Sequence, residues 1–137
     1  MPHSDSRMVI LVVEDEPLVR MFLADALDEA GFKVFEAVSA DEAITLLQAP
    51  PDIQAVVTDI EMPGSMNGIG LAQPVRERWP GIGLLVTSGR VRPGPDDLPS
   101  DVAFLAKPYL LDTVITVIRQ MAMPQVIGLV PNAAQAR

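Results

Sequence analysis

The chain carries an aspartate at the end of an apolar, strand-like run, and this residue is the first candidate for chemistry. Residues 55–59 read AVVTD, and Pro63 follows shortly after Asp59. A carboxylate buried inside a strand carries a large desolvation cost unless it is paired or bound to a metal. At the last residue of a strand, the same side chain can face a crevice instead. We therefore interpret Asp59 as the reactive centre.

Other polar residues follow apolar runs in the same way. Glu14 and Asp15 come after MVILVV, Thr87 ends IGLLVT, and Lys107 follows VAFLA. Three neighbouring carboxylates repel one another, and a divalent cation relieves this repulsion. An all-oxygen site with positions open to water and phosphate suits Mg²⁺. A carboxylate beside such a cation can attack a phosphoryl group, which predicts an acyl phosphate on Asp59. Lys107 and the Thr87 hydroxyl would then bind phosphate oxygens.

The elements that must position these residues alternate between strand-like runs and amphipathic helices. Strands are expected at residues 8–13, 33–37, 53–58, 82–87 and 102–106. Helices are expected at residues 18–30, 40–47, 71–79 and 110–121, with Gly31 as a C-terminal cap and a capping box at Ser39 and Glu42. This alternation predicts an α/β fold with a doubly wound parallel sheet, in which ligands bind beyond the carboxyl ends of the strands. All the candidate residues should therefore face one crevice.

Two stretches break the regular pattern. Pro74 lies inside the third helical segment and removes one backbone hydrogen bond there, so we expect either a kink or a helix that begins later. Residues 90–101 read RVRPGPDDLPSD, a composition that cannot sustain a regular helix of ordinary length. At best, one helical turn is expected near Asp96.

Composition excludes several classes of function. The chain has 137 residues, which suits one domain, and no cysteine, which excludes disulfides and thiolate metal sites. His3 is the only histidine and lies in a polar N-terminal arm, so a Ser/His catalytic pair is excluded. The net charge of -8 argues against a nucleic-acid surface. No apolar run approaches the length of a membrane span, and no signal peptide is present, so we expect a cytoplasmic protein.

Four motifs make the chain resemble the receiver domains of two-component response regulators. They are VVEDEP at residues 12–17, TDIEMP at residues 58–63 with Gly68 beyond it, LLVTSG at residues 84–89, and KP at residues 107–108. The resemblance covers residues 8–121 and leaves a flexible arm at residues 1–7 and a C-terminal tail at residues 122–137. It implies a flavodoxin-like five-stranded parallel sheet with strand order 2-1-3-4-5. Where the family has a fourth helix, this chain has the proline-rich residues 90–101.

The resemblance also implies a role for each candidate residue. Asp59 is the implied phosphoacceptor. The implied Mg²⁺ ligands are Asp15, Asp59 and the main-chain carbonyl of Glu61, with Glu14 acting through water. Lys107 and Thr87 are implied to assist catalysis, and Thr87 and Phe104 to act as the switch residues. The phosphoryl donor implied by the family is a histidine kinase or a histidine phosphotransfer protein, and the downstream protein is unknown.

Alternatives remain open at this stage. Asp15 could simply cap the helix that starts at Pro17, Asp59 could be an ordinary turn residue, Thr87 a strand residue, Lys107 a solvated lysine and Phe104 a core residue. No output domain is expected, because roughly 16 residues after Met121 cannot fold alone. We therefore expect a signalling switch that acts through partner binding. A phosphorelay intermediate, a phosphate sink, an aspartyl-phosphate hydrolase and a degenerate receiver are the alternatives.

Overall fold

A five-stranded parallel sheet forms the centre of the molecule. The computed structural model describes residues 7–49, 52–62, 66–90, 92–94, 96–99 and 101–122. The strands lie in the order β2-β1-β3-β4-β5, and every neighbouring pair is parallel, which confirms the predicted doubly wound fold and its strand order. Their bounds are β1 Val9–Val13, β2 Lys33–Ala37, β3 Ala55–Asp59, β4 Gly83–Ser88 and β5 Ala103–Ala106.

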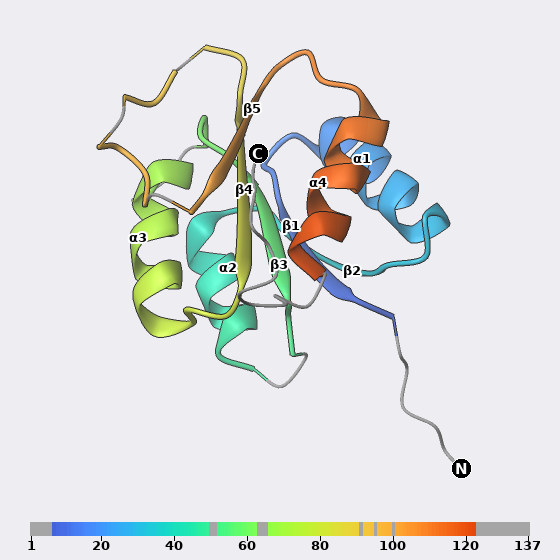
Figure 1. Cartoon of the computed structure of the whole chain (residues 1–137), viewed down its shortest axis with the longest axis horizontal. Coiled ribbons are helices and arrows are strands. Elements are labelled where there is room, and N and C mark those ends of the chain that lie inside the picture. Colours follow the sequence, from blue (N-terminus) through green and yellow to red (C-terminus); the bar gives the residue numbers. More distant parts are fainter. Residues whose placement is uncertain are drawn as a thin grey trace, which may run out of the picture.

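Helices cover both faces of the sheet. The described helices are α1 Pro17–Glu29, α2 Ala40–Leu47, α3 Gly68–Arg78 and α4 Leu111–Ala122. Figure 1 shows α1 and α4 on one face and α2 and α3 on the other. Because successive strand residues point to opposite faces, neighbours in one strand enter different cores. Leu11 and Val56 pack with the α2 and α3 layer, whereas Ile10 and Val57 pack with the α1 and α4 layer. The central strands are therefore buried on both sides, as their continuous apolar runs indicate.

Local sequence signals set the ends of three helices. Gly31, which follows α1, adopts a φ of 102°, a left-handed conformation that favours glycine. The Ser39 side chain accepts a hydrogen bond from the Glu42 backbone N–H at 3.1 Å and caps α2. The Glu42 side chain in turn accepts from the backbone N–H of Val38. Asn67 caps α3 by accepting from the Gly70 backbone N–H at 2.9 Å.

Of the two alternatives expected from Pro74, a kink or a helix that begins later, the later start is wrong. Helix α3 begins at Gly68 and continues through Pro74 to Arg78. The Asn67 cap supports the first turn, and Leu71 and Val75 are fully buried on either side of the proline along the chain. Burial of two large side chains and a satisfied cap therefore offset the backbone hydrogen bond that Pro74 removes.

No helix occurs in the described part of the segment between β4 and β5, which confirms the predicted departure at residues 90–101. Residues 96–98 form only a turn, in which the Asp97 backbone N–H donates to the Gly94 carbonyl. Near the end of the segment, Asp101 forms an ion pair with Arg76 of α3 at 3.2 Å. In its described part, the connection therefore has no helical face to pack on the sheet, although Leu98 and Val102 pack against the core.

The predicted arm and tail lie almost entirely outside the described residues, which include only Arg7 of the arm and Ala122 of the tail. Within the described ranges, no helix has the length and apolar character needed to cross a membrane.

Candidate functional site

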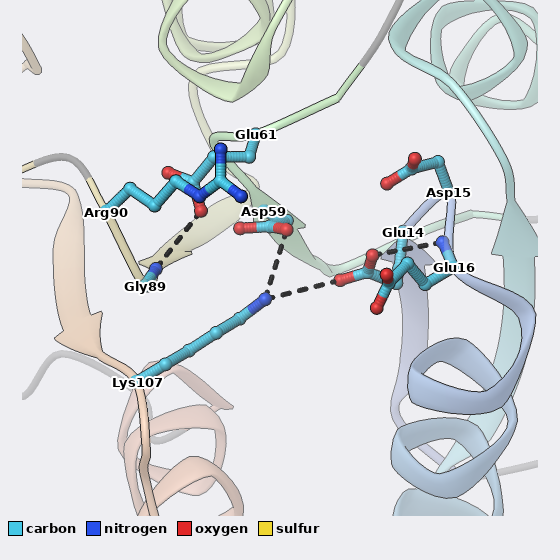
Figure 2. A pocket seen from close by; sticks show the side chains of 8 residues that line it. All are labelled: Glu14, Asp15, Glu16, Asp59, Glu61, Gly89, Arg90 and Lys107. Carbon is cyan, nitrogen blue, oxygen red and sulfur yellow. Dashed lines mark hydrogen bonds and ion pairs between the residues drawn. The ribbon is translucent and has the colours of Figure 1, made fainter.

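A pocket of about 440 Å³ opens at the carboxyl ends of the strands, where the sequence places the chemistry. It is lined by the predicted residues Glu14 and Asp15 after β1, Asp59 at the end of β3, and Lys107 after β5. Figure 2 shows these side chains converging from separate elements. Glu61, also a predicted site residue, lines the pocket as well, and Glu16, Gly89 and Arg90 complete the lining. The sheet topology has thus brought together residues that are as much as 93 positions apart in sequence, because parallel strands end at the same edge.

Lys107 links the two buried carboxylates of the pocket. Its Nζ donates a hydrogen bond to Asp59 Oδ2 at 3.1 Å and lies 3.8 Å from Glu14 Oε1. The side chains of Glu14 and Asp59 are each only 5% exposed, and that of Lys107 is 29% exposed. The interpretation of Lys107 as an ordinary solvated lysine is therefore wrong: it is held as the counter-ion of the site.

Two carboxylates of the pocket, those of Glu14 and Asp59, are costly to ionise. Burial raises the pKa of Glu14 to about 7, from an ordinary value of 4.5. Burial also raises the pKa of Asp59, although the hydrogen bond and charge of Lys107 act against this rise. For Lys107, burial acts to lower the pKa, but the hydrogen bond and charge of Asp59 and the charge of Glu14 raise it overall. Lys107 therefore stays charged, and a further positive charge in the pocket would stabilise the ionised carboxylates.

The acidic group fits a hard divalent cation. Glu14, Asp15 and Asp59 each offer a carboxylate oxygen, and these oxygens lie within 4.8 Å of one another. Among the described residues, Asp59 Oδ1 is buried and has no hydrogen-bond partner. A buried, unpartnered carboxylate oxygen is destabilising unless a cation satisfies it. Oxygen-only ligands from few residues are what Mg²⁺ accepts in proteins.

Asp15 does not cap the first helix. The N-terminal cap of α1 is Glu16, and it makes no side-chain capping hydrogen bond. The backbone at Glu16 instead donates to Glu14 Oε2 at 3.1 Å. Arg20 of α1 donates to the main-chain carbonyl of Glu14 at 2.9 Å and pairs with Glu36 of β2 at 3.2 Å. The acidic turn is therefore fixed from both flanking elements, while Asp15 remains directed to the pocket.

The side chain of Glu61 connects the loop after β3 to the end of β4, a role that sequence reasoning missed. Its carboxylate accepts a hydrogen bond from Ser88 Oγ and another from the Gly89 backbone N–H at 3.1 Å. The sequence contained only a weak signal, an acid two residues after Asp59 and a serine next to Thr87. This pairing holds the backbone beyond Asp59 against the strand that carries Thr87.

Thr87 and Phe104 lie near the site but do not line the pocket. Thr87 is the in-register neighbour of Asp59 across the β3–β4 ladder, and its main-chain carbonyl accepts from the Ile60 N–H at 2.9 Å. Phe104 of β5 pairs in register with Val86, one residue before Thr87, and is half-buried. Both predicted switch residues therefore sit on the strands that border the pocket.

A family model for the response regulator receiver domain matches residues 10–94, more than half of the chain. The chain belongs to this family. It is therefore a receiver domain of two-component signalling, a phosphoryl-accepting switch. Lys107 lies beyond the matched range, so its place in this receiver domain depends on the structure, which brings it to Asp59.

Curated relatives of this receiver domain differ widely in length. HoxA, the hydrogenase transcriptional regulatory protein of Cupriavidus necator, is 35% identical over 128 residues, which cover 89% of this chain and 26% of HoxA. Sensor kinase CckA of Brucella abortus is 34% identical over 120 residues, 85% of this chain and 13% of CckA. Response regulator receiver protein CpdR of Brucella abortus is 36% identical over 115 residues, 82% of this chain and 94% of CpdR. The chain thus spans a small part of the first two relatives and nearly all of the third.

Solved receiver structures share the fold. A response regulator receiver protein from Sinorhizobium medicae superposes with a TM-score of 0.75 at 28% identity, over 86% of this chain and 96% of that one. Response regulator TrrA from Thermotoga maritima, solved in complex with Mg²⁺ and BeF, also has a TM-score of 0.75, at 24% identity over 83% of this chain and 98% of TrrA. The second likeness supports the fold alone.

Proposed function

We propose that Asp59 accepts a phosphoryl group from a phosphohistidine of a histidine kinase or a histidine phosphotransfer protein, and that the chain then acts by binding a downstream protein. The observation that carries the proposal is the setting of the Asp59 carboxylate. Lys107 holds one oxygen at 3.1 Å, the other is buried without a hydrogen bond among the described residues, and carboxylate oxygens of Glu14 and Asp15 lie within 4.8 Å. Phosphoryl transfer requires a nucleophile, a fixed positive charge beside it and a position for a metal cation. Here Asp59 is the nucleophile, Lys107 is the fixed charge, and the three carboxylates offer the metal position.

The transfer step has a simple balance. One carboxylate oxygen of Asp59 attacks phosphorus, the bond between phosphorus and the donor nitrogen breaks, and the imidazole leaves. Lys107, already within hydrogen-bond distance of Asp59, then pairs with a phosphoryl oxygen as a point charge. Hydrolysis reverses the modification when water attacks phosphorus and releases inorganic phosphate and the free carboxylate.

Asp15 and Asp59 are the proposed direct ligands of Mg²⁺, with the Glu61 main-chain carbonyl as a third ligand and Glu14 bound through water. The all-oxygen donor set of Glu14, Asp15 and Asp59 supports this choice of metal. When bound, Mg²⁺ supplies charge neutralisation for both the nucleophile and the phosphoryl oxygens. We assign the water-mediated contact to Glu14 because its carboxylate already interacts with Lys107 and with the backbone N–H of Glu16.

The signal is proposed to leave the site through β4 and β5. Thr87 lies beside Asp59 in the sheet, and its hydroxyl would move to bind a phosphoryl oxygen. Phe104, in register with the neighbour of Thr87, would change rotamer in response. The Glu61 side chain connects to Ser88, the residue after Thr87, so the loop after Asp59 and the end of β4 would move together.

The test is to incubate the protein with acetyl phosphate and Mg²⁺ and measure its intact mass. The expected result is one added phosphoryl group on the wild type and none on Asp59→Asn. Asp28→Asn, a matched change at an exposed aspartate of α1, should leave the adduct intact. An unmodified wild type, or an equal adduct on Asp59→Asn, would contradict the proposal.

A further inference from the structure

Arg90 lines the pocket of Asp59 from the segment between β4 and β5, whose described part contains no helix. It lies two residues beyond the end of β4 and lines the same pocket as Asp59 and Lys107. In the view of Figure 2, its side chain crosses that of Glu61, and its guanidinium lies on the side of Arg90 that faces Asp59. Arg92, the next arginine, is not among the residues that line this pocket; it lines a smaller neighbouring pocket that contains neither Asp59 nor the acidic turn.

The pocket contains more acid than its lysine can balance. Five carboxylates line it, and the basic residues among its lining are Lys107 and Arg90. Lys107 already serves both Asp59 and Glu14. Phosphorylation of Asp59 replaces a single negative charge by a group of roughly two charges. A second basic side chain in the lining is therefore positioned where the new charge appears.

The backbone that carries Arg90 is anchored to the loop after Asp59. The Arg90 backbone N–H donates to Ser88 Oγ at 3.2 Å, and Ser88 Oγ donates to the Glu61 carboxylate. The Gly89 backbone N–H donates to the same carboxylate at 3.1 Å. The exposed side chain of Arg90 thus extends from a fixed base, which lowers the entropic cost of placing its guanidinium on a ligand.

We propose that Arg90 binds the phosphoryl group on Asp59 through its guanidinium, as a second cationic contact beside Lys107. The inference rests on the proposed function of Asp59. A guanidinium presents two parallel N–H groups that match two phosphoryl oxygens, whereas the ammonium of Lys107 is a point charge. This contact brings the first residues of the segment between β4 and β5 closer to Asp59. Phosphorylation therefore changes the position of a connection that contains no helix in its described part.

The simpler role for Arg90 is to offset the charge of Glu61 on the protein surface. Such a role predicts no preference for a bound phosphoryl group, and it predicts the same result for any arginine of the segment. Arg92 offers the matched control, because Arg90→Gln and Arg92→Gln remove the same charge two residues apart.

The experiment measures beryllofluoride binding by ¹⁹F NMR in the presence of saturating Mg²⁺, on the full chain. Arg90→Gln should weaken beryllofluoride binding about tenfold relative to wild type, the size expected for one charge-assisted contact, and Arg92→Gln should change it less than about twofold. Arg90→Lys should lie between wild type and Arg90→Gln, because it keeps the charge and loses the paired N–H groups. The Mg²⁺ affinity of Arg90→Gln, measured without beryllofluoride, should not fall, because removing a positive charge cannot weaken a cation site electrostatically.

Binding by Arg90→Gln that is less than about fivefold weaker than binding by Arg92→Gln would overturn the role of Arg90. If Arg90→Gln fails to fold, as judged by circular dichroism, Arg90→Lys decides: binding equal to wild type overturns the paired contact. A wild type that acquires no phosphoryl group from acetyl phosphate refutes the proposed function itself. A wild type that is phosphorylated while both glutamine variants bind beryllofluoride equally refutes only the inference about Arg90.

Discussion

Replacing Glu14 by glutamine should stabilise the metal-free protein above neutral pH. Glu14 is 4% exposed, and burial raises its pKa to about 7 in the folded state, against 4.5 ordinarily. Between these two values the folded protein binds the proton and the unfolded chain does not. The free energy of unfolding therefore falls as the pH rises from 4.5 through about 7. Glutamine cannot ionise, so the variant escapes this loss.

The structure bounds the size of the effect. A pKa that rises from 4.5 to about 7 corresponds to at most about 3 kcal/mol of lost stability at pH 8. The variant also loses the ion pair between Glu14 and Lys107 at 3.8 Å, which at a partly exposed lysine contributes about 1 kcal/mol or less. The hydrogen bond from the Glu16 N–H can persist, because the amide of glutamine keeps an acceptor oxygen. The net expectation is a gain of about 1–2 kcal/mol at pH 8 and almost none at pH 4.

The assay is urea unfolding of wild type, Glu14→Gln and Glu16→Gln in buffers free of divalent cations, at pH 4, 6 and 8 (about two-unit steps across the window). Glu16→Gln is the matched control. It removes the same charge from the lining of the same pocket, but Glu16 is exposed. A gain in Glu14→Gln that is equally large at pH 4, or that Glu16→Gln reproduces, would refute the reasoning from burial.

Three further outcomes follow from the site. Mg²⁺ should raise the melting temperature far more at pH 8 than at pH 5, because ligand carboxylates must be ionised to bind it; equal shifts at both pH values, by differential scanning fluorimetry, would contradict a carboxylate site. Gly68→Ala should lower the free energy of unfolding by about 2–4 kcal/mol, because a Cβ there would collide with the backbone carbonyl of Asp59. Gly81→Ala, with open space around it, should be nearly neutral in the same urea unfolding experiment. Equal losses in the two variants would refute the collision. Amide hydrogen exchange at Arg92, Gly94, Asp96, Asp97 and Leu98 should slow when beryllofluoride binds. Unchanged exchange at these residues would show that the segment does not become ordered when the site is occupied.

The sequence was most informative where strands end. Asp59, Asp15 and Lys107 could be assigned to one crevice because each follows an apolar run, and parallel strands finish at a common edge. The absence of a helix in the described part of residues 90–101 was equally predictable, since closely spaced prolines remove backbone donors and disfavour helical φ/ψ angles in the residues before them.

What the sequence could not show depends on side-chain conformation and on packing. The hydrogen bond between Ser88 and Glu61 joins residues 27 positions apart. Neither a serine nor a glutamate at such a position predicts the contact by itself. Arg90 enters the pocket because its backbone is tied to Ser88, which no periodicity reveals. Helix α3 passes through Pro74 because buried neighbours and the Asn67 cap outweigh one lost hydrogen bond, a balance that local propensity does not contain.

The most direct test of the central claim is to locate the phosphoryl group. The protein is incubated with acetyl phosphate and Mg²⁺, the acyl phosphate is reduced with borohydride to homoserine, and the modified residue is identified by peptide mass spectrometry. Homoserine at position 59, absent when Mg²⁺ is chelated, is the result that we expect. Homoserine at Asp15 or at another carboxylate, or at position 59 to the same extent without Mg²⁺, would contradict the account of the site.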